Sequence, residues 1–253
     1  MGAGPGAPDL LTLRAARLLE QAEVVLHDAL VHPDTLALAS RARLVNVGKR
    51  SGARSTDQRF ICRYLVSAAK HHQTVVRLKG GDPMLFGRAQ EELDALQAEG
   101  IDVEVVPGIT AALAASAQLK APLTRRGDGR SVLFLTPRVG TGQTTHDWAR
   151  SSRAADTLAL YMAAGDARRT MEQLIDAGWS ETTPIALMES ASLAEARSWR
   201  GELGDLPHLA RELGRGPVML LVGAALGAAS TKSSACVWPQ TPVRSSSGGL
   251  APG

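Results

Sequence analysis

Glycines gather at the start of the chain, in the run Gly2-Ala3-Gly4-Pro5-Gly6-Ala7. Such spacing lets the backbone turn tightly and approach a ligand closely, while a following helix offers its N-terminal N–H groups. The run matches the dinucleotide fingerprint G-x-G-x-x-A, and Asp28 lies about 20 residues further on, where an acidic residue would bind the ribose. The fingerprint should follow a strand, however, and here it follows Met1. An NAD-dependent oxidoreductase and a structural turn without a ligand are both open at this point.

A second glycine loop, Gly80-Gly81-Asp82-Pro83, follows a short apolar run that is typical of a strand. Two glycines after a strand leave backbone groups accessible to a ligand, and Pro83 keeps Asp82 out of helical geometry. The same residues would also form an ordinary turn from a strand to a helix. The loop on its own therefore favours neither interpretation.

The sequence gives little support for a metal site or for nucleic-acid binding. Cys62 and Cys236 provide neither a disulfide framework nor the spacing of zinc ligands, and the pair His71-His72 is typical of a solvated loop. Four Trp, three Phe and two Tyr are few for a protein that stacks single-stranded bases. We therefore expect no metal site and no nucleic-acid partner.

The charge of the chain is unevenly placed. The formal net charge of the 253 residues is +3, and Lys232 and Arg244 supply two of these charges from a segment rich in Ser, Gly and Pro. Residues 1–226 are close to neutral, which argues against an anionic membrane as partner, and residues 227–253 have the composition of a disordered tail. No apolar stretch approaches the ~18 residues of a membrane span, and no basic region followed by an apolar one marks the start for export. We expect a cytoplasmic protein.

Strand and helix patterns alternate along the chain, which predicts an α/β fold with much parallel pairing. The length allows two domains, which we place at residues 1–120 and 121–226. In the first we expect strands at 23–28, 43–47, 74–78 and 102–106, and helices at 10–22, 36–39, 58–71, 90–98 and 110–118. In the second we expect strands at 131–136, 157–162, 184–189, 199–203 and 218–222, helices at 167–177 and 206–213, and a loop at 138–152.

The two glycine loops belong to a longer series of motifs that occur in a fixed order. The series comprises Gly2–Gly6, Pro8–Leu13, His27–Val31, Val47–Arg50, Val75–Pro83, Phe86–Arg88, Glu91-Glu92, Val105–Ala111, Pro122–Thr124, Tyr161-Met162, Gly216-Pro217 and Val222-Gly223. Together these motifs resemble the uroporphyrinogen-III C-methyltransferases, which use S-adenosylmethionine (SAM) and belong to the tetrapyrrole methylases. The resemblance covers residues 1 to about 226.

This resemblance implies two α/β domains with SAM in the cleft between them, in a homodimer. The implied activity is transfer of two methyl groups from SAM to pyrrole carbons of uroporphyrinogen III, which gives precorrin-2 for sirohaem or cobalamin. A methyltransferase acting on a later corrinoid precursor and a non-catalytic relative are the alternatives within the family. An NAD-dependent oxidoreductase is the alternative from a different class.

The resemblance also implies roles for individual residues. Asp28 is the implied base, because attack by a pyrrole carbon leaves a cationic ring that must lose a proton, and Lys49 is its partner as acid or substrate anchor. The implied SAM-binding residues are Pro5, Gly80, Gly81, Asp82, Leu85, Thr110, Ala111, Met162 and Ala191. Arginines bind carboxylates with a planar fork, and the substrate is a polycarboxylate. The expected substrate-binding arginines are Arg50, Arg88, Arg125 and Arg126.

The chain departs from the family pattern at several positions near the implied SAM and substrate sites. Ala7 stands where Asp is usual, His27 where Tyr is usual, and Ala163 and Ala191 each where glycine is usual. The largest departure is at the N-terminus, because the family has a strand of several residues ahead of the glycine loop and this sequence has Met1. We therefore expect a truncated N-terminus and a first sheet that lacks one central strand.

Overall fold

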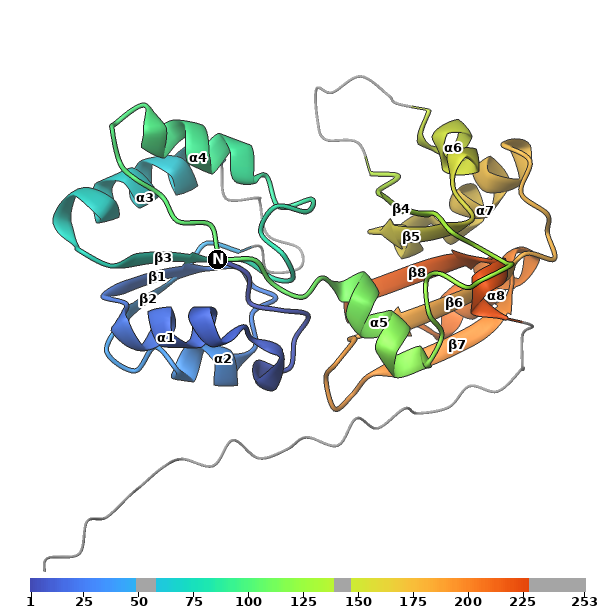
Figure 1. The fold of residues 1–253 in the computed structure, drawn as a ribbon, viewed down its shortest axis with the longest axis horizontal. Helices are drawn as coiled ribbons and strands as arrows, with labels where there is room; N and C mark the ends of the chain where they lie inside the picture. Colours follow the sequence, from blue (N-terminus) through green and yellow to red (C-terminus); the bar gives the residue numbers. More distant parts are fainter. Residues whose placement is uncertain (49–57, 139–146, 228–253) are drawn as a thin grey trace, which may run out of the picture.

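The computed structural model describes residues 1–48, 58–138 and 147–227, which form two α/β bodies side by side (Figure 1). Three short parallel strands make the first sheet, in the order β2-β1-β3. These strands are β1 (Val24–His27), β2 (Arg43–Asn46) and β3 (Val75–Leu78). The α/β fold that the sequence predicted is confirmed, and the parallel pairing holds for this first sheet but not for most of the second.

Helices cover both faces of this first sheet (Figure 1). One face carries α1 (Leu13–Gln21) and α2 (Pro33–Ala37), and the other carries α3 (Gln58–His71) and α4 (Ala89–Gln97). Successive side chains of a strand point to opposite faces, so Val25 belongs to the core beside α1 and Leu26 to the core beside α3. The expected helix 10–22 begins only at Leu13, because Thr12 caps it by accepting a hydrogen bond from the backbone N–H of Ala15.

The outer edge of β3 meets the N-terminal residues rather than another strand. The N–H of Lys79 donates to the carbonyl of Met1 (3.0 Å), and the N–H of Gly2 donates to the carbonyl of Val106 (3.0 Å). Beyond these contacts, β3 and residues 101–106 border a groove of about 350 Å³. Leu18 of α1, Leu65 of α3 and Leu96 of α4 also line this groove, which we call the edge groove.

The strand expected at residues 102–106 is absent from the described structure, and this prediction was wrong. A β-strand needs a neighbouring strand for its ladder of hydrogen bonds, and the edge groove separates these residues from β3. The side chains of Val103 and Val105 are 38% and 41% exposed as a result. The apolar alternation is present, but the partner strand is not.

Five strands make the second sheet, in the order β4-β5-β8-β6-β7. They are β4 (Val132–Leu135), β5 (Thr157–Tyr161), β6 (Pro184–Glu189), β7 (Arg197–Glu202) and β8 (Val218–Gly223). Only the pair β4–β5 is parallel among these described strands; the β5–β8, β6–β8 and β6–β7 pairs are antiparallel.

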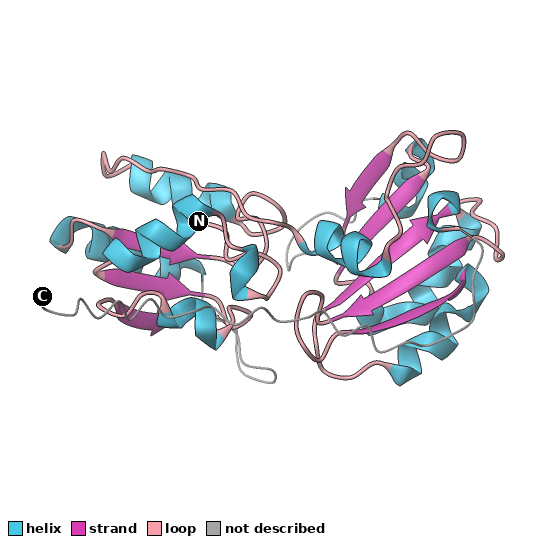
Figure 2. Cartoon of the chain, turned by 60° about the horizontal axis from the view of Figure 1, so that its bottom comes forward, coloured by secondary structure: helices cyan, strands magenta, loops and turns pink. Residues whose placement is uncertain are grey.

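Helices also cover both faces of the second sheet (Figure 2). Leu158 and Leu160 of β5 face a core with α6 (Trp148–Ser151), α7 (Ala167–Asp176) and α8 (Leu206–Leu209). Ala159 between them faces α5 (Ala111–Leu119), which is the last helix of the expected first domain yet packs on this second sheet.

The remaining helical elements are short. Helix α6 lies inside the loop expected at 138–152, so that expectation was wrong for residues 148–151, where Asp147 caps the helix by accepting from the N–H of Arg150. The 3-10 helices are η1 (Pro8–Leu10), η2 (Ser152–Ala154), η3 (Ala164–Asp166), η4 (Leu203–Asp205), η5 (Ala210–Glu212) and η6 (Ala224–Leu226). In the described ranges no helix combines the length and the apolar character that a membrane span requires. The expected tail, residues 227–253, lies outside the described residues except for Gly227.

Candidate active site

Loops from both bodies contact one another where the two sheets approach each other. They comprise residues 2–7, 79–88, 107–111, 161–163 and 190–193, and we call them the loop junction. The glycine loops lie at its centre. Gly4 and Gly81 exchange two backbone hydrogen bonds, from N–H of Gly4 to carbonyl of Gly81 (3.2 Å) and from N–H of Gly81 to carbonyl of Gly4 (2.7 Å).

Glycine is required here for two different reasons. A Cβ atom on Gly108 would lie 2.3 Å from the carbonyl oxygen of Gly81, so the two backbones can approach only without a side chain. Gly81 itself has a φ of +68°, a conformation that favours glycine, and a Cβ built on it would meet nothing closer than Thr110 Cα at 3.9 Å. The backbone of Gly81 is therefore uncovered on that side, as a ligand-binding loop requires.

The carboxylate of Asp82 holds this loop in shape. Its Oδ2 accepts a hydrogen bond from the N–H of Gly108 and its Oδ1 accepts one from the N–H of Met84, both at 2.9 Å. Asp82 thus links the second glycine loop to the segment that leads into α5. It also places a negative charge beside the uncovered backbone of Gly81.

Two hydrogen bonds connect the bodies across the loop junction. The hydroxyl groups of Thr110 and Tyr161 are 2.6 Å apart, and the N–H of Ala7 donates to Ser192 Oγ at 2.9 Å. The ring of Phe86 lies against that of Tyr161, with 5.0 Å between centroids. Burial raises the pKa of Tyr161, although the hydrogen bond with Thr110 opposes the shift, so the phenol stays neutral at ordinary pH.

Backbone strain is concentrated at the same place. Non-glycine residues with φ between +51° and +71° in the loop junction are Phe86, Arg88, Met162, Ser190 and Ser192. Each such conformation costs free energy and persists only where the surrounding structure enforces it, which is common at ligand-binding and catalytic sites. The strain is therefore independent support for a site at the loop junction.

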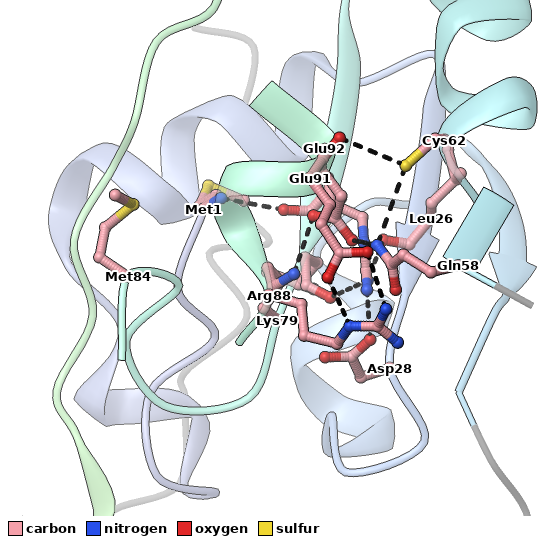
Figure 3. A network of polar contacts seen from close by, with 12 residues as sticks. Met1, Leu26, Asp28, Gln58, Cys62, Lys79, Met84, Arg88, Glu91 and Glu92 are labelled. Atoms are coloured by element: carbon pink, nitrogen blue, oxygen red, sulfur yellow. Dashed lines mark hydrogen bonds and ion pairs between the residues drawn. The ribbon is translucent and has the colours of Figure 1, made fainter. Parts of the chain in front are cut away.

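Asp28 follows β1 and lies beside a network of buried charges (Figure 3). Its Oδ1 accepts a hydrogen bond from Arg77 Nη2 of β3 at 2.6 Å. Arg77 Nε donates in turn to Glu92 Oε1 (3.0 Å), and Lys79 Nζ donates to Glu92 Oε2 (2.8 Å). Burial alone would raise the pKa of Glu92, but the charges of Arg77 and Lys79 and their hydrogen bonds outweigh it and hold that pKa below its ordinary value.

The arginines expected to bind substrate lie in different surroundings. Arg88 is 57% exposed and forms a two-pronged ion pair with Glu91, with both N···O distances 2.7 Å. Arg125 is equally exposed and pairs with Asp128 at 3.2 Å, and Arg126 is exposed beside it. Lys49 and Arg50 lie outside the described residues. Substrate binding by these arginines stays a prediction.

The structure brings most of the expected cofactor residues to the loop junction. Pro5, Gly80, Gly81, Asp82, Thr110 and Ala111 lie on the joined segments of the first body and the start of α5, and Leu85 follows in the same loop as Asp82. Met162 and Ala191 come from the second body, next to the tethering residues Tyr161 and Ser192. Their contact with a cofactor stays a prediction. No group of three or more potential metal ligands gathers among the described residues.

Sequence reasoning missed Arg77, Lys79 and Glu92 as parts of the site. One signal in the sequence pointed to Arg77, which interrupts the apolar run Val75–Leu78. A charged residue inside a strand with helices on both faces needs a buried partner. The sequence held no such signal for Glu92, because nothing in it predicts that Glu92 is more buried than its neighbour Glu91.

Comparisons with known proteins place the chain in one family. A family model described as "Tetrapyrrole (Corrin/Porphyrin) Methylases" matches residues 1–207. The chain is 44% identical over 227 residues to the uroporphyrinogen-III C-methyltransferase of Pseudomonas aeruginosa, covering 88% of this chain and 91% of that protein. It is 45% identical over 224 residues to siroheme synthase 2 of Aeromonas hydrophila, but this covers only 47% of that protein. The chain thus spans about half the length of that siroheme synthase.

A solved structure shows the same likeness in three dimensions. The uroporphyrin-III C-methyl transferase of Thermus thermophilus, complexed with S-adenyl homocysteine, superposes with a TM-score of 0.78 at 38% sequence identity. The match covers 89% of this chain and 96% of that one.

Proposed function

Because this chain belongs to the tetrapyrrole (corrin/porphyrin) methylase family, we propose that it transfers methyl groups from SAM to pyrrole carbons of uroporphyrinogen III, giving precorrin-2. The observation that carries the proposal is the 44% identity to the Pseudomonas aeruginosa enzyme, which extends over 91% of that enzyme's length. The likeness to the Thermus thermophilus enzyme with S-adenyl homocysteine supports SAM as the methyl donor.

The loop junction fits such a ligand. The uncovered backbone of Gly81 and the first turn of α5 offer N–H and C=O groups to a cofactor that has many polar atoms, and glycine at Gly81 leaves room for it. The proposed SAM-binding residues are Pro5, Gly80, Gly81, Asp82, Leu85, Thr110, Ala111, Met162 and Ala191. The negative charge of Asp82 beside this backbone suits a cationic sulfonium.

When bound, SAM supplies an electrophilic methyl group, and the residues of this chain align the acceptor carbon with it. Alignment of two reactants contributes several kcal/mol, up to about 7–11 in ideal cases. Methylation of a pyrrole carbon leaves a cationic ring, Asp28 takes the proton that this ring must lose, and Lys49 is its partner. Arg50, Arg88, Arg125 and Arg126 bind the carboxylates of the substrate.

Turnover with both substrates tests this function. The protein is incubated with SAM and uroporphyrinogen III without oxygen, and S-adenosylhomocysteine and the mass of the tetrapyrrole are followed. We expect a gain of two methyl groups. Binding of SAM without turnover would favour a later corrinoid precursor or a non-catalytic relative. Absence of SAM binding would reject the proposal.

The variant Asp28→Asn tests whether Asp28 is the base. The amide keeps the shape of the carboxylate and can still accept a hydrogen bond from Arg77, but it cannot take a proton at the same site. We expect SAM affinity to stay within about twofold of wild type while kcat falls by about 10² or more.

We also propose that the protein acts as a homodimer in the cytoplasm. The likeness to the uroporphyrinogen-III C-methyltransferases supports this proposal. Light scattering behind a sizing column measures the assembly state, and cell fractionation measures the location.

A further inference from the structure

Asp28, the proposed base, is held by a residue of a neighbouring strand. It comes directly after β1, and its side chain is 30% exposed, so the carboxylate would otherwise be able to rotate. Arg77 Nη2 of β3 donates to Asp28 Oδ1 at 2.6 Å, and no described residue forms a hydrogen bond with Oδ2. One oxygen is thus fixed, and within the described structure the other is left to act on substrate.

Arg77 is itself fixed from its other side. Its side chain is 11% exposed, and Nε donates to Glu92 Oε1 of α4 at 3.0 Å. Glu92 is 6% exposed and also accepts from Lys79 Nζ and Gln58 Nε2, at 2.8 and 3.2 Å. Arg77 Nη1 also donates to the backbone carbonyls of Leu78 (3.1 Å) and Leu26 (3.5 Å), so the sheet backbone and the buried Glu92 together hold the guanidinium.

The charges in this network alternate and balance. Two carboxylates, Asp28 and Glu92, face two cations, Arg77 and Lys79, and a buried pair of this kind is stable only with such complete partnering. Lys79 immediately precedes Gly80, so the same network joins the end of β1 to the glycine loop of the loop junction. Figure 3 shows Asp28, Lys79 and Glu92 converging from separate elements.

We propose that Arg77, held by Glu92, is a positioning residue that fixes the orientation of Asp28 relative to the glycine loop. The proposal rests on the proposed function, in which Asp28 is the base. A guanidinium suits this role because its planar fork reaches two carboxylates in one fixed geometry, whereas a lysine offers a single point charge. Displacement of a catalytic group by about 1 Å can lower a rate by about 10².

The first test is Arg77→Lys, which keeps the charge but cannot reach both Asp28 and Glu92. We expect kcat for methylation to fall by about 10², while the Kd for SAM and the KM for uroporphyrinogen III stay within about twofold. Arg200→Lys is the matched control, because Arg200 also bridges two elements, the carbonyls of Leu119 and Leu226, away from Asp28. The control should lower Tm without lowering kcat.

The second test asks whether Arg77 acts through Asp28. In an Asp28→Asn background, Arg77→Lys should cause no further loss of S-adenosylhomocysteine formation, because the group that it positions no longer takes the proton. Fully multiplicative losses in the double variant would overturn the proposal. Unchanged kcat in Arg77→Lys would overturn it as well.

A third variant covers the case in which Arg77→Lys does not fold. Glu92→Asp keeps every charge and withdraws the carboxylate from Arg77 by one methylene, and we expect a kcat loss of about tenfold that also disappears in the Asp28→Asn background. Unchanged kcat in Glu92→Asp would then overturn the proposal. Failure of the wild-type protein to methylate overturns the proposed function instead, and this inference falls with it.

Discussion

The hydroxyl groups of Thr110 and Tyr161 lie 2.6 Å apart and connect the first body to the second. Thr110 precedes α5, and Tyr161 ends β5, so the hydrogen bond joins the start of a helix to the end of a strand. The ring of Tyr161 also contacts Phe86 from the loop after Asp82. One side chain therefore connects the second sheet to two segments of the loop junction.

Tyr161→Phe should keep the ring contact and remove this hydrogen bond. We expect a loss of about 1 kcal/mol in the free energy of unfolding and weaker SAM binding, since the N-terminal end of α5 is less firmly placed. Tyr64→Phe is the control, because Tyr64 is the other tyrosine of the chain and lies on α3, away from the loop junction. Denaturant titration and calorimetric SAM titration measure the two effects. Equal losses in both variants would contradict the role of Tyr161.

Gly108→Ala should open the loop junction by steric clash alone. The new Cβ would lie 2.3 Å from the carbonyl oxygen of Gly81, so the segment at residues 107–111 must separate from the second glycine loop, at a cost of about 2–3 kcal/mol. Gly204→Ala is the matched control: like Gly108 it has no positive φ, and a Cβ there would meet nothing closer than the Glu181 carbonyl oxygen at 3.6 Å. The control gives the effect of an added Cβ without a steric clash. If Gly108→Ala binds SAM as wild type does, the close approach is not needed for the site.

The stability conferred by Glu92 should depend on pH. Its pKa in the folded protein lies below the ordinary value, so its ionisation stabilises the fold above the unfolded pKa of about 4.3 and this contribution is lost as pH falls below it. Glu92→Gln should cost about 3 kcal/mol at pH 7, because it leaves Arg77 and Lys79 as poorly compensated buried cations.

The difference between wild type and Glu92→Gln is the quantity to measure, from pH 7 down to pH 3, by denaturant unfolding. Carboxylates outside this network make the same contribution in both proteins and cancel in this difference. We expect the difference to narrow below pH 4.3. A difference that stays constant over this range would mean that Glu92 is not held ionised by Arg77 and Lys79.

The edge groove should accept one added strand. Five apolar, strand-forming residues joined ahead of Met1 would extend along β3, beside Leu18 and Leu96, and each buried side chain contributes about 1.5–3 kcal/mol. We expect a clear rise in Tm relative to a Gly-Ser extension of the same length. Equal Tm values for the two extended proteins would show that the groove does not bind a strand.

The parts of the fold that the sequence could predict depend on local patterns. The β1 and β3 strands are short apolar runs, and helix α3 occupies the expected residues 58–71. The glycine loops were recognised because glycine and proline restrict the backbone at fixed positions. The order of several motifs along the chain predicted the family, which neither glycine loop could have predicted alone.

The parts that could not be predicted depend on contacts between distant residues. Residues 102–106 have a strand pattern, but a strand forms only where a neighbour completes its hydrogen bonds. The bond between Arg77 and Asp28 spans 49 positions of the chain, and the bond between Arg77 and Glu92 spans 15. Neither distance corresponds to a helical or strand repeat, so no periodicity could reveal that these charges meet.

The positive φ angles at Phe86, Met162, Ser190 and Ser192 have a consequence for how the protein loses its structure. Each of these residues would relax if it were released, at a gain of about 1–3 kcal/mol, so the loops oppose folding while the two apolar cores drive it. Heat or denaturant should therefore free the loop junction before it melts either sheet. Inactivation would then precede unfolding, and a bound ligand would protect activity more than it protects secondary structure.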